Sequence, residues 1–127
     1  LGWDKNKIKY SAANNAPIVV QNGILKELDA DSMPVGKGAL ATNEPFQKYS
    51  LDSLKEGDII YLCTDGFADQ FGGPKGKKFK KKNLIVLLDK IKSLSMDVQK
   101  LKLEACFDEW KEDLEQVDDV LIVGIKI

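Results

Sequence analysis

The 127-residue sequence contains no histidine and no arginine, so every basic residue is a lysine. Without imidazole, catalysis by Ser–His or Cys–His pairs and histidine-ligated metal sites are excluded. Any metal ion must be held by oxygen ligands, which favours Mg²⁺, Mn²⁺ or Ca²⁺. Without guanidinium, bidentate recognition of phosphate or guanine is excluded as well. The net charge of -1 also gives no support for a nucleic-acid partner.

Cysteines and long apolar runs are scarce too. Cys63 and Cys106 have no ligand or disulfide spacing and lie in apolar surroundings, so we interpret them as reduced core residues of a cytoplasmic protein. No apolar run approaches the ~20 residues of a membrane span. The first residues, from Leu1, have no signal-peptide character, and we expect the chain to be a piece of a longer protein. Its length is that of one domain.

Short apolar segments alternate with turn signals along the chain, which is typical of an antiparallel sheet. Residues 59–63 form one such segment, too short for a helix and rich in β-formers. Asn22-Gly23 is a tight hairpin signal between two others. Residues 29–45 lack periodicity and match neither a calcium loop nor a phosphate loop, so we expect a structured loop there. Strands are expected at residues 7–12, 18–20, 24–29, 46–51, 59–63 and 120–125.

Two helices are expected in the second half of the chain. Asn83 is a candidate N-cap for the first helix, and Ser95 for the second. Both segments have apolar residues at helical spacing, which predicts that one face of each helix packs on the core. The two stripes are Leu84, Leu87, Leu88, Ile91 and Leu94, and then Leu103, Phe107, Trp110 and Leu114.

Carboxylates stand at the ends of two expected strands. Asp65 follows the segment 59–63, and Asp118 precedes the segment 120–125. If these strands are antiparallel neighbours, both acids lie at one edge of the sheet and could share a metal ion. The adjacent acids Asp118 and Asp119 repel each other unless a cation or hydrogen-bond donors compensate. The alternative is two unrelated turn aspartates, with Asp65 capping the turn or helix that follows it.

Lysines crowd the segment before the first expected helix. They are Lys75, Lys77, Lys78, Lys80, Lys81 and Lys82. One interpretation is a solvated loop. The other is a docking patch for an anionic partner, with Lys77, Lys78 and Lys80 as the docking residues.

Five short motifs carry a family resemblance over nearly the whole chain. They are residues 9–17 (KYSAANNAP), 33–36 (MPVG), 57–66 (GDIIYLCTDG), 67–73 (FADQFGG) and 116–120 (QVDDV). In this order and spacing they resemble the C-terminal part of a SpoIIE-like protein serine/threonine phosphatase of the metal-dependent PPM superfamily. The resemblance implies an α+β fold, an antiparallel β-sandwich flanked by helices and incomplete at its N-terminus. Residues 1–127 would then be the C-terminal portion of one phosphatase domain.

The resemblance also implies a site for two Mn²⁺ or Mg²⁺ ions that activate a water nucleophile. Asp65 and Asp118 match family ligands of one ion, while Gly66, Asp69 and Asp119 match its surroundings. The implied substrate is a phosphorylated regulator, such as an anti-sigma-factor antagonist. The family's bacterial branch further implies a sensor domain upstream, with this domain in the cytosol even where the sensor is anchored in a membrane.

The chain departs from the family pattern in one respect, since the upstream metal-binding motifs are absent. We expect them before Leu1, and we expect residues 1–127 alone to be inactive; a degenerate relative is the alternative. A haloacid-dehalogenase phosphatase is disfavoured, because Cys63 stands where its nucleophilic aspartate would be. A non-catalytic partner-binding module remains a rival. We also expect self-association through an uncovered strand edge at Ile8 and Tyr10.

Overall fold

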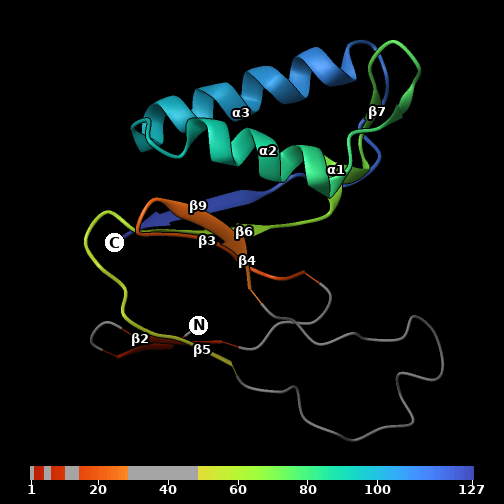
Figure 1. Ribbon diagram of the computed structural model, residues 1–127. Coiled ribbons are helices and arrows are strands. Elements are labelled where there is room, and N and C mark those ends of the chain that lie inside the picture. Colours follow the sequence, from red (N-terminus) through yellow and green to blue (C-terminus); the bar gives the residue numbers. More distant parts are fainter. Residues whose placement is uncertain (1, 5–6, 11–14, 29–48) are drawn as a thin grey trace, which may run out of the picture.

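The computed structural model describes residues 2–4, 7–10, 15–28 and 49–127. Figure 1 shows two helices above a four-stranded sheet and a smaller sheet below it, which confirms the predicted α+β antiparallel architecture. The elements are β1 (Gly2–Asp4), β2 (Lys7–Tyr10), β3 (Ile18–Gln21), β4 (Ile24–Glu27), β5 (Tyr49–Leu51), β6 (Ile59–Cys63), α1 (Gly66–Asp69), β7 (Phe71–Gly72), β8 (Lys77–Lys78), α2 (Lys81–Ile91), α3 (Met96–Lys111) and β9 (Ile122–Lys126).

The larger sheet has the strand order β4-β3-β6-β9, and every neighbouring pair is antiparallel. The predicted hairpin between β3 and β4 turns at Asn22 and Gly23, both of which have positive φ. β9 pairs with β6 from Ile59↔Lys126 to Cys63↔Ile122. The smaller sheet has the order β1-β2-β5, and β7 and β8 form a separate hairpin. The last strand of the chain therefore completes the sheet beside β6.

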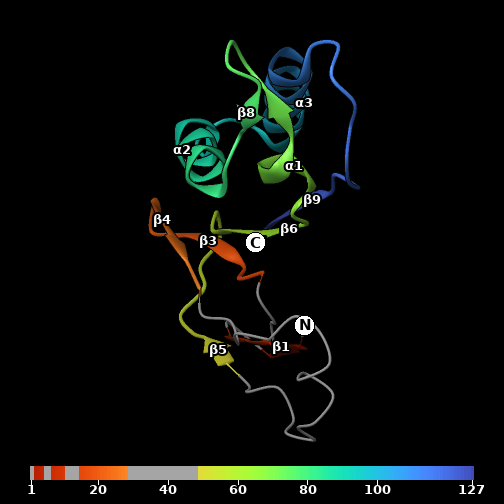
Figure 2. The ribbon, with the colours of Figure 1, turned by 90° about the vertical axis from the view of Figure 1, so that its right-hand side faces the viewer.

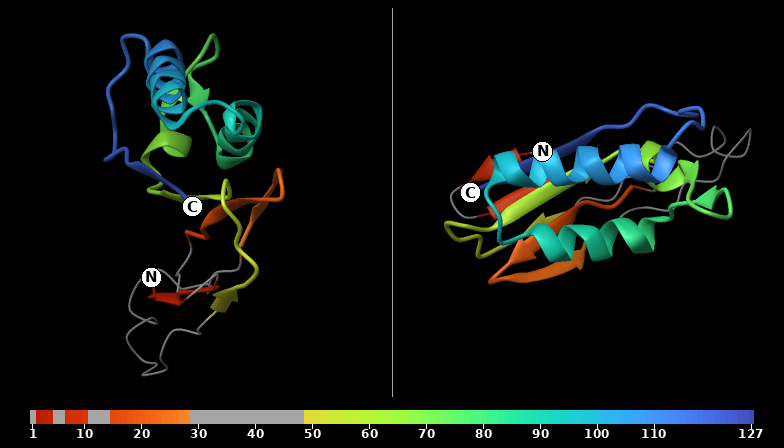
Figure 3. Two further views of the ribbon diagram at one scale, coloured as in Figure 1. Left: turned by 90° about the vertical axis from the view of Figure 1, so that its left-hand side faces the viewer. Right: turned by 90° about the horizontal axis from the view of Figure 1, so that it is seen from above.

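The main core lies between the helices and the larger sheet. Alternate strand residues point to it, because side chains of a strand alternate between faces. Figure 2 shows α2 and α3 end-on above this sheet, and the view from above in Figure 3 shows them lying side by side along it. The buried residues are Ile18, Val20, Ile59, Tyr61, Phe67, Phe79, Leu84, Leu88, Ile91 and Phe107. On the opposite face a smaller cluster joins Val19 and Ile60 to Leu51 and Leu54.

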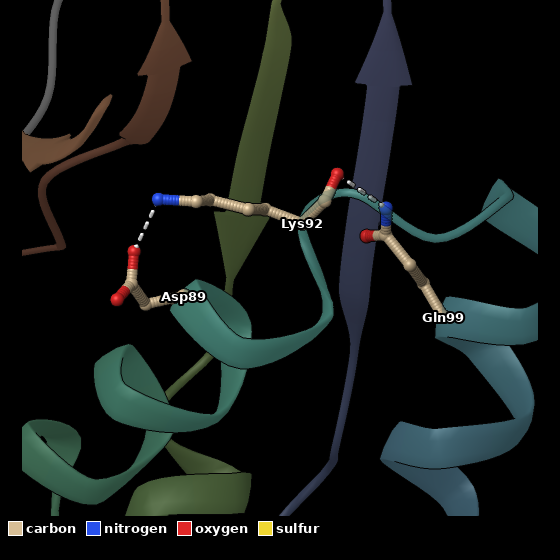
Figure 4. Close-up of polar contacts among 3 residues, drawn as sticks. All are labelled: Asp89, Lys92 and Gln99. Carbon is tan, nitrogen blue, oxygen red and sulfur yellow. Dashed lines mark hydrogen bonds and ion pairs between the residues drawn. The ribbon is translucent and has the colours of Figure 1, made fainter. Parts of the chain in front are cut away.

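Gln99 fastens the turn between α2 and α3. Its amide nitrogen donates to the carbonyls of Lys92 (3.3 Å) and Leu94 (2.9 Å), and its oxygen accepts from the Tyr61 hydroxyl at 2.5 Å. Figure 4 shows Gln99 facing Lys92, whose ammonium pairs with Asp89 at 2.7 Å. Since Gln99 is only 2% exposed, these bonds satisfy a polar group that burial would otherwise penalise.

The predicted Ser95 cap is confirmed, because the Ser95 hydroxyl accepts from the Val98 amide at 3.3 Å. The Asn83 cap is wrong. α2 begins three residues earlier, with Lys80 at the N-cap position, and the Asn83 side-chain amide donates to the Phe79 carbonyl at 2.6 Å. The apolar stripes were also too long, because each helix ends before the last residue of its stripe. Leu94 and Leu114 follow their helices and are exposed.

Several strand bounds differ from the prediction, and β3 and β9 each end one residue later than expected, at Gln21 and Lys126. β4 stops at Glu27, and β9 starts only at Ile122. The expected open edge at Ile8 and Tyr10 is wrong, because β2 pairs with β1 on one side and β5 on the other. Part of the expected strand 46–51 and the expected loop 29–45 lie outside the described residues. Among the described residues, no helix is both long and apolar enough to span a membrane.

Candidate metal centre

The carboxyl end of β6 and the amino end of β9 meet at one edge of the larger sheet. The antiparallel register places Cys63 opposite Ile122, so the chain after Cys63 runs beside the chain before Ile122. Asp65 therefore lies at the same end of the strand pair as Asp118 and Asp119. The sequence predicted this adjacency only if the two strands were antiparallel neighbours. That pairing is confirmed. Whether the two acids share an ion stays a prediction.

Thr64 continues the pairing beyond the last ladder residue. Its amide donates to the Leu121 carbonyl at 2.9 Å. Its hydroxyl donates to the Asp119 carbonyl at 2.9 Å and accepts from the Leu121 amide at 3.0 Å. One side chain thus fixes the segment that carries the acidic pair against the start of α1. Sequence reasoning treated Thr64 only as part of a motif, since a threonine between a strand and an aspartate gives no local sign of such bonds.

Gly66 allows the two chain segments to come this close. It is buried, and a Cβ atom at this position would overlap the Asp119 carbonyl group and press on the Val120 side chain. Only glycine fits such a backbone approach without a shift. The resemblance placed Gly66 beside the site, and the structure gives it this physical task.

The carboxylates of the two candidate ligands have different surroundings. Asp65 precedes α1, yet its side chain makes no capping hydrogen bond, and among the described residues it has no ion-pair partner. The capping interpretation is therefore wrong for its side chain. Asp118 accepts from the Asp119 amide at 2.7 Å through one oxygen. Both acids are exposed, so their oxygens are accessible to a cation.

Asp69 lies at the far end of α1 from Asp65. Its carboxylate approaches the Lys78 ammonium at 3.8 Å, which ties α1 to the β7–β8 hairpin. Lys78 also lies 5.8 Å from the centre of the Phe71 ring. Lys77 and Lys80 are exposed, and Lys80 has a positive φ of 75° at the start of α2. The role of Asp69 near a metal and the docking role of the lysines stay predictions.

Two titratable side chains of β6, the strand that leads to Asp65, are held neutral. Burial raises the pKa of the Cys63 thiol to about 11, against a smaller lowering effect of Lys81. Burial likewise raises the pKa of the Tyr61 phenol to about 12. Cys63 is thus poorly suited to be a nucleophile at neutral pH, because the thiolate is the reactive form. Cys63 and Cys106 are both free and partly buried beside the main core, as the sequence predicted.

The described residues do not by themselves form a complete set of metal ligands. No group of three or more acidic or cysteine side chains comes together within them. The donors that do meet at the β6–β9 edge are carboxylate oxygens, which suit Mn²⁺ and Mg²⁺. The chemistry of the donor set therefore fits these ions, and further ligands have to come from elsewhere.

The chain is similar to solved phosphatase domains along nearly its whole length. It matches the SiaA-PP2C domain of Pseudomonas aeruginosa with a TM-score of 0.82 and 22% identity, covering 97% of this chain and 47% of that one. It matches the PP2C domain with a regulatory-domain fragment of SpoIIE from Bacillus subtilis with a TM-score of 0.64 and 18% identity, covering 95% and 34%. It matches the Mn-presoaked phosphatase domain of SpoIIE from Bacillus subtilis with a TM-score of 0.56 and 18% identity, covering 95% of this chain and 49% of that one.

These identities show a shared fold, and the chain spans about half the length of these solved chains or less. The curated proteins give no match. A family model, that of stage II sporulation protein E (SpoIIE), matches residues 2–127. Because this match takes in nearly every residue, the chain belongs to the SpoIIE family and has the fold of part of a PP2C phosphatase domain.

Proposed function

We propose that residues 1–127 form the C-terminal half of a metal-dependent phosphatase domain that hydrolyses phosphoserine or phosphothreonine in a regulatory protein. The observation that carries this proposal is the pairing of β6 with β9, which brings Asp65 and the acidic pair to one edge of the sheet. The SpoIIE family membership supports the same chemistry.

Asp65 and Asp118 would hold one Mn²⁺ or Mg²⁺ ion, with Asp119 and Gly66 beside it. The two ions of a complete domain supply an activated water and neutralise the phosphoryl oxygens. The residues of this chain do the positioning. Thr64 holds the Asp119 carbonyl and the Leu121 amide, so the acidic pair cannot drift from Asp65 without breaking two hydrogen bonds.

The substrate that we propose is a Ser/Thr-phosphorylated regulator, such as an anti-sigma-factor antagonist. In this proposal an upstream sensor domain controls the phosphatase, and the domain works in the cytoplasm. The support is the family itself together with the all-oxygen donor set.

A second candidate function is a non-catalytic partner-binding module. The observation that favours it is the lack of a third metal-binding side chain within the described residues. A protein with only two carboxylates at this edge would bind Mn²⁺ weakly, because most of the coordination sphere would remain water. The two functions therefore differ in metal affinity as well as in turnover.

The test uses a longer protein in which this chain is part of a complete phosphatase domain. Asp65→Ala and Asp118→Ala should each abolish Mn²⁺-dependent dephosphorylation and weaken Mn²⁺ binding measured by calorimetry, while circular dichroism stays unchanged. Lys100→Gln, an exposed change on α3, is the control and should retain full activity.

Activity within about twofold of the parent in either aspartate variant would contradict the ligand assignment. Parent protein that binds its partner but shows neither turnover nor Mn²⁺ binding would establish the non-catalytic module instead. For residues 1–127 alone, we expect weak Mn²⁺ binding and no turnover.

A further inference from the structure

The β7–β8 hairpin and its exit carry a concentrated positive charge. Between residues 71 and 82 every charged side chain is a lysine, although the whole chain has a net charge of -1. The structure separates these lysines into two groups. Lys78 pairs with Asp69 at 3.8 Å, and Lys81 pairs with Glu27 at 3.5 Å. The other four have no ion-pair partner among the described residues, and all are exposed: Lys75, Lys77, Lys80 and Lys82.

Contacts with α1 and α3 hold the β7–β8 hairpin in place. The Gly73 amide donates to the Trp110 carbonyl at 3.0 Å, and a Cβ atom at Gly72 would overlap that same carbonyl. The Phe79 ring packs edge-on against Phe67, with centroids 5.2 Å apart, and against Trp110 at 5.3 Å. The lysines therefore stand on a support fixed to α1 and α3, so binding there costs less ordering than binding to a free loop.

The hairpin also lies beside the candidate metal centre. α1 is the only element between Asp65 and β7, and the Lys80 amide donates to the Ala68 carbonyl at 2.7 Å. Figure 1 shows the hairpin at the same end of the molecule as the segment that leads from α3 to β9. That segment, residues 112–119, is acidic and is tied to the hairpin base through Gln70, whose amide donates to the Glu115 carbonyl at 2.8 Å.

The charges near the site are thus polarised, with unpaired lysines on the hairpin and carboxylates on residues 112–119. An anionic segment is attracted by the first and repelled by the second. A long uniform polyanion such as duplex nucleic acid would meet both, whereas a short acidic stretch of protein can lie on the hairpin alone. Lysine ammonium groups act as point charges, so recognition would follow charge density and salt concentration instead of a fixed sequence.

We propose that the β7–β8 hairpin and the start of α2 form a docking surface for an acidic segment of the phosphoprotein substrate, bound by Lys75 and Lys77 of the hairpin and by Lys80 and Lys82 at the start of α2. This inference rests on the proposed function for the identity of the partner and deepens it by giving the partner's chemistry. It differs from the sequence-based hypothesis in three residues. Lys78 is engaged with Asp69 and Phe71, so it supports the hairpin, and Lys75 and Lys82 join the docking set.

The test measures binding without turnover, using residues 1–127 as a chain. The probes are two fluorescein-labelled phosphoserine peptides that differ only in having four glutamates or four glutamines on one side of the phosphoserine. Fluorescence anisotropy at low salt should show binding of the glutamate peptide about tenfold tighter than that of the glutamine peptide. The triple variant Lys75→Gln/Lys77→Gln/Lys80→Gln should remove the difference.

The control triple variant Lys90→Gln/Lys100→Gln/Lys102→Gln removes the same charge from exposed helix positions and should retain the preference. Equal loss in both triple variants, or equal binding of the two peptides by the parent, would overturn the proposal. A short DNA duplex that displaces the glutamate peptide at equal concentration would also overturn it, in favour of a general polyanion surface. Since no turnover is measured, a failed phosphatase assay leaves this result standing, and a failed binding assay leaves the phosphatase proposal standing.

Discussion

The two sides of the four-stranded sheet are covered to different extents. On the side of α2 and α3, Tyr61 and Leu88 are at most 1% exposed. On the other side, at β9, Val123 and Ile125 are each 38% exposed. On the helix side, a groove of about 510 Å³ opens between α3 and β9, lined by side chains such as Leu103 and Ile122. Away from this groove the helix side is a closed core. On the other side Val19 and Ile60 are also buried, but β9 leaves apolar surface and a strand edge in solvent.

β9 has the sequence of an interior strand and, among the described residues, the position of an edge strand. Residues 120–125 contain no charged side chain, a pattern found where a strand is buried on both faces. By contrast β4, at the other edge, carries Lys26 and Glu27, and charges protect an edge from pairing with another chain. The difference indicates that β9 is built to receive a neighbour.

The largest effect is expected inside the closed core. Phe67 is 2% exposed, and its ring contacts Phe79 and Phe107. Phe67→Ala should lower the free energy of unfolding by about 3–5 kcal/mol, because it leaves a cavity that rigid neighbours cannot fill. Val123→Ala on β9 is the matched comparison and should cost less than about 1 kcal/mol. Urea denaturation followed by tryptophan fluorescence measures both, and equal losses would show that the two sides do not differ.

The next effect concerns the seam between β6 and β9. Gly66→Ala should lower the free energy of unfolding by about 1–3 kcal/mol, because the new methyl group meets the rigid Asp119 carbonyl. Gly124→Ala is the control. Its Cβ would lie 2.7 Å from the Met96 methyl group, the end of a flexible side chain that can move away. Chemical denaturation should show a larger loss of stability for Gly66→Ala than for Gly124→Ala. An unchanged free energy of unfolding in Gly66→Ala would mean that the Asp119 carbonyl can move away from residue 66.

A smaller effect is expected at the β9 edge. We propose that residues 1–127 self-associate through β9, and that Ile125→Lys weakens association about tenfold by placing a charge on the exposed apolar strand. Sedimentation velocity at several protein concentrations measures the dissociation constant. Ile24→Lys, at an exposed position on the charged edge strand β4, should leave association unchanged. A parent protein that stays monomeric at all concentrations would contradict the proposal that residues 1–127 self-associate through β9.

The smallest effect is expected for a buried hydrogen bond on the helix side of the sheet. Tyr61→Phe removes the bond to Gln99 and should cost about 1 kcal/mol at neutral pH. Burial raises the Tyr61 pKa from 10.0 to about 12, so the unfolded chain loses the phenol proton first as pH rises. The contribution of Tyr61 to stability should therefore be intact below pH 10 and be lost between pH 10 and 12, in addition to the loss that the raised Cys63 pKa causes from pH 9. Tyr61→Phe should flatten this part of the curve, and an unchanged slope would show that Tyr61 does not titrate late.

Local patterns were sufficient for much of this fold. The Asn22-Gly23 hairpin and the strand at residues 59–63 depend on neighbours in sequence, so they were predictable. The start of α2 was not, because Lys80 adopts a positive φ that nothing in its side chain favours. Pairing of β7 with β8 was missed as well, since each strand has only two residues.

The candidate site was predictable only in part, for a physical reason. Acids at strand ends can be found in a sequence, but their adjacency depends on β6 and β9 being neighbours across three intervening helices and a hairpin. The bonds made by the Thr64 hydroxyl and the close approach at Gly66 follow from that pairing. The division of the lysines into paired and unpaired groups likewise depends on Glu27, which is far from them in sequence.

The pairing of β6 with β9 also sets an order of events during biosynthesis. β6 is synthesised before α2 and α3, and its partner β9 follows both helices. Contacts between segments so far apart in the chain form slowly, because a long loop must close first. Until then the apolar edge of β6 has only β3 beside it, and it is open to unwanted partners. Nascent chains of this protein should accordingly depend on chaperones until β9 emerges, and Asp65 and Asp118 should meet only in the last step of folding.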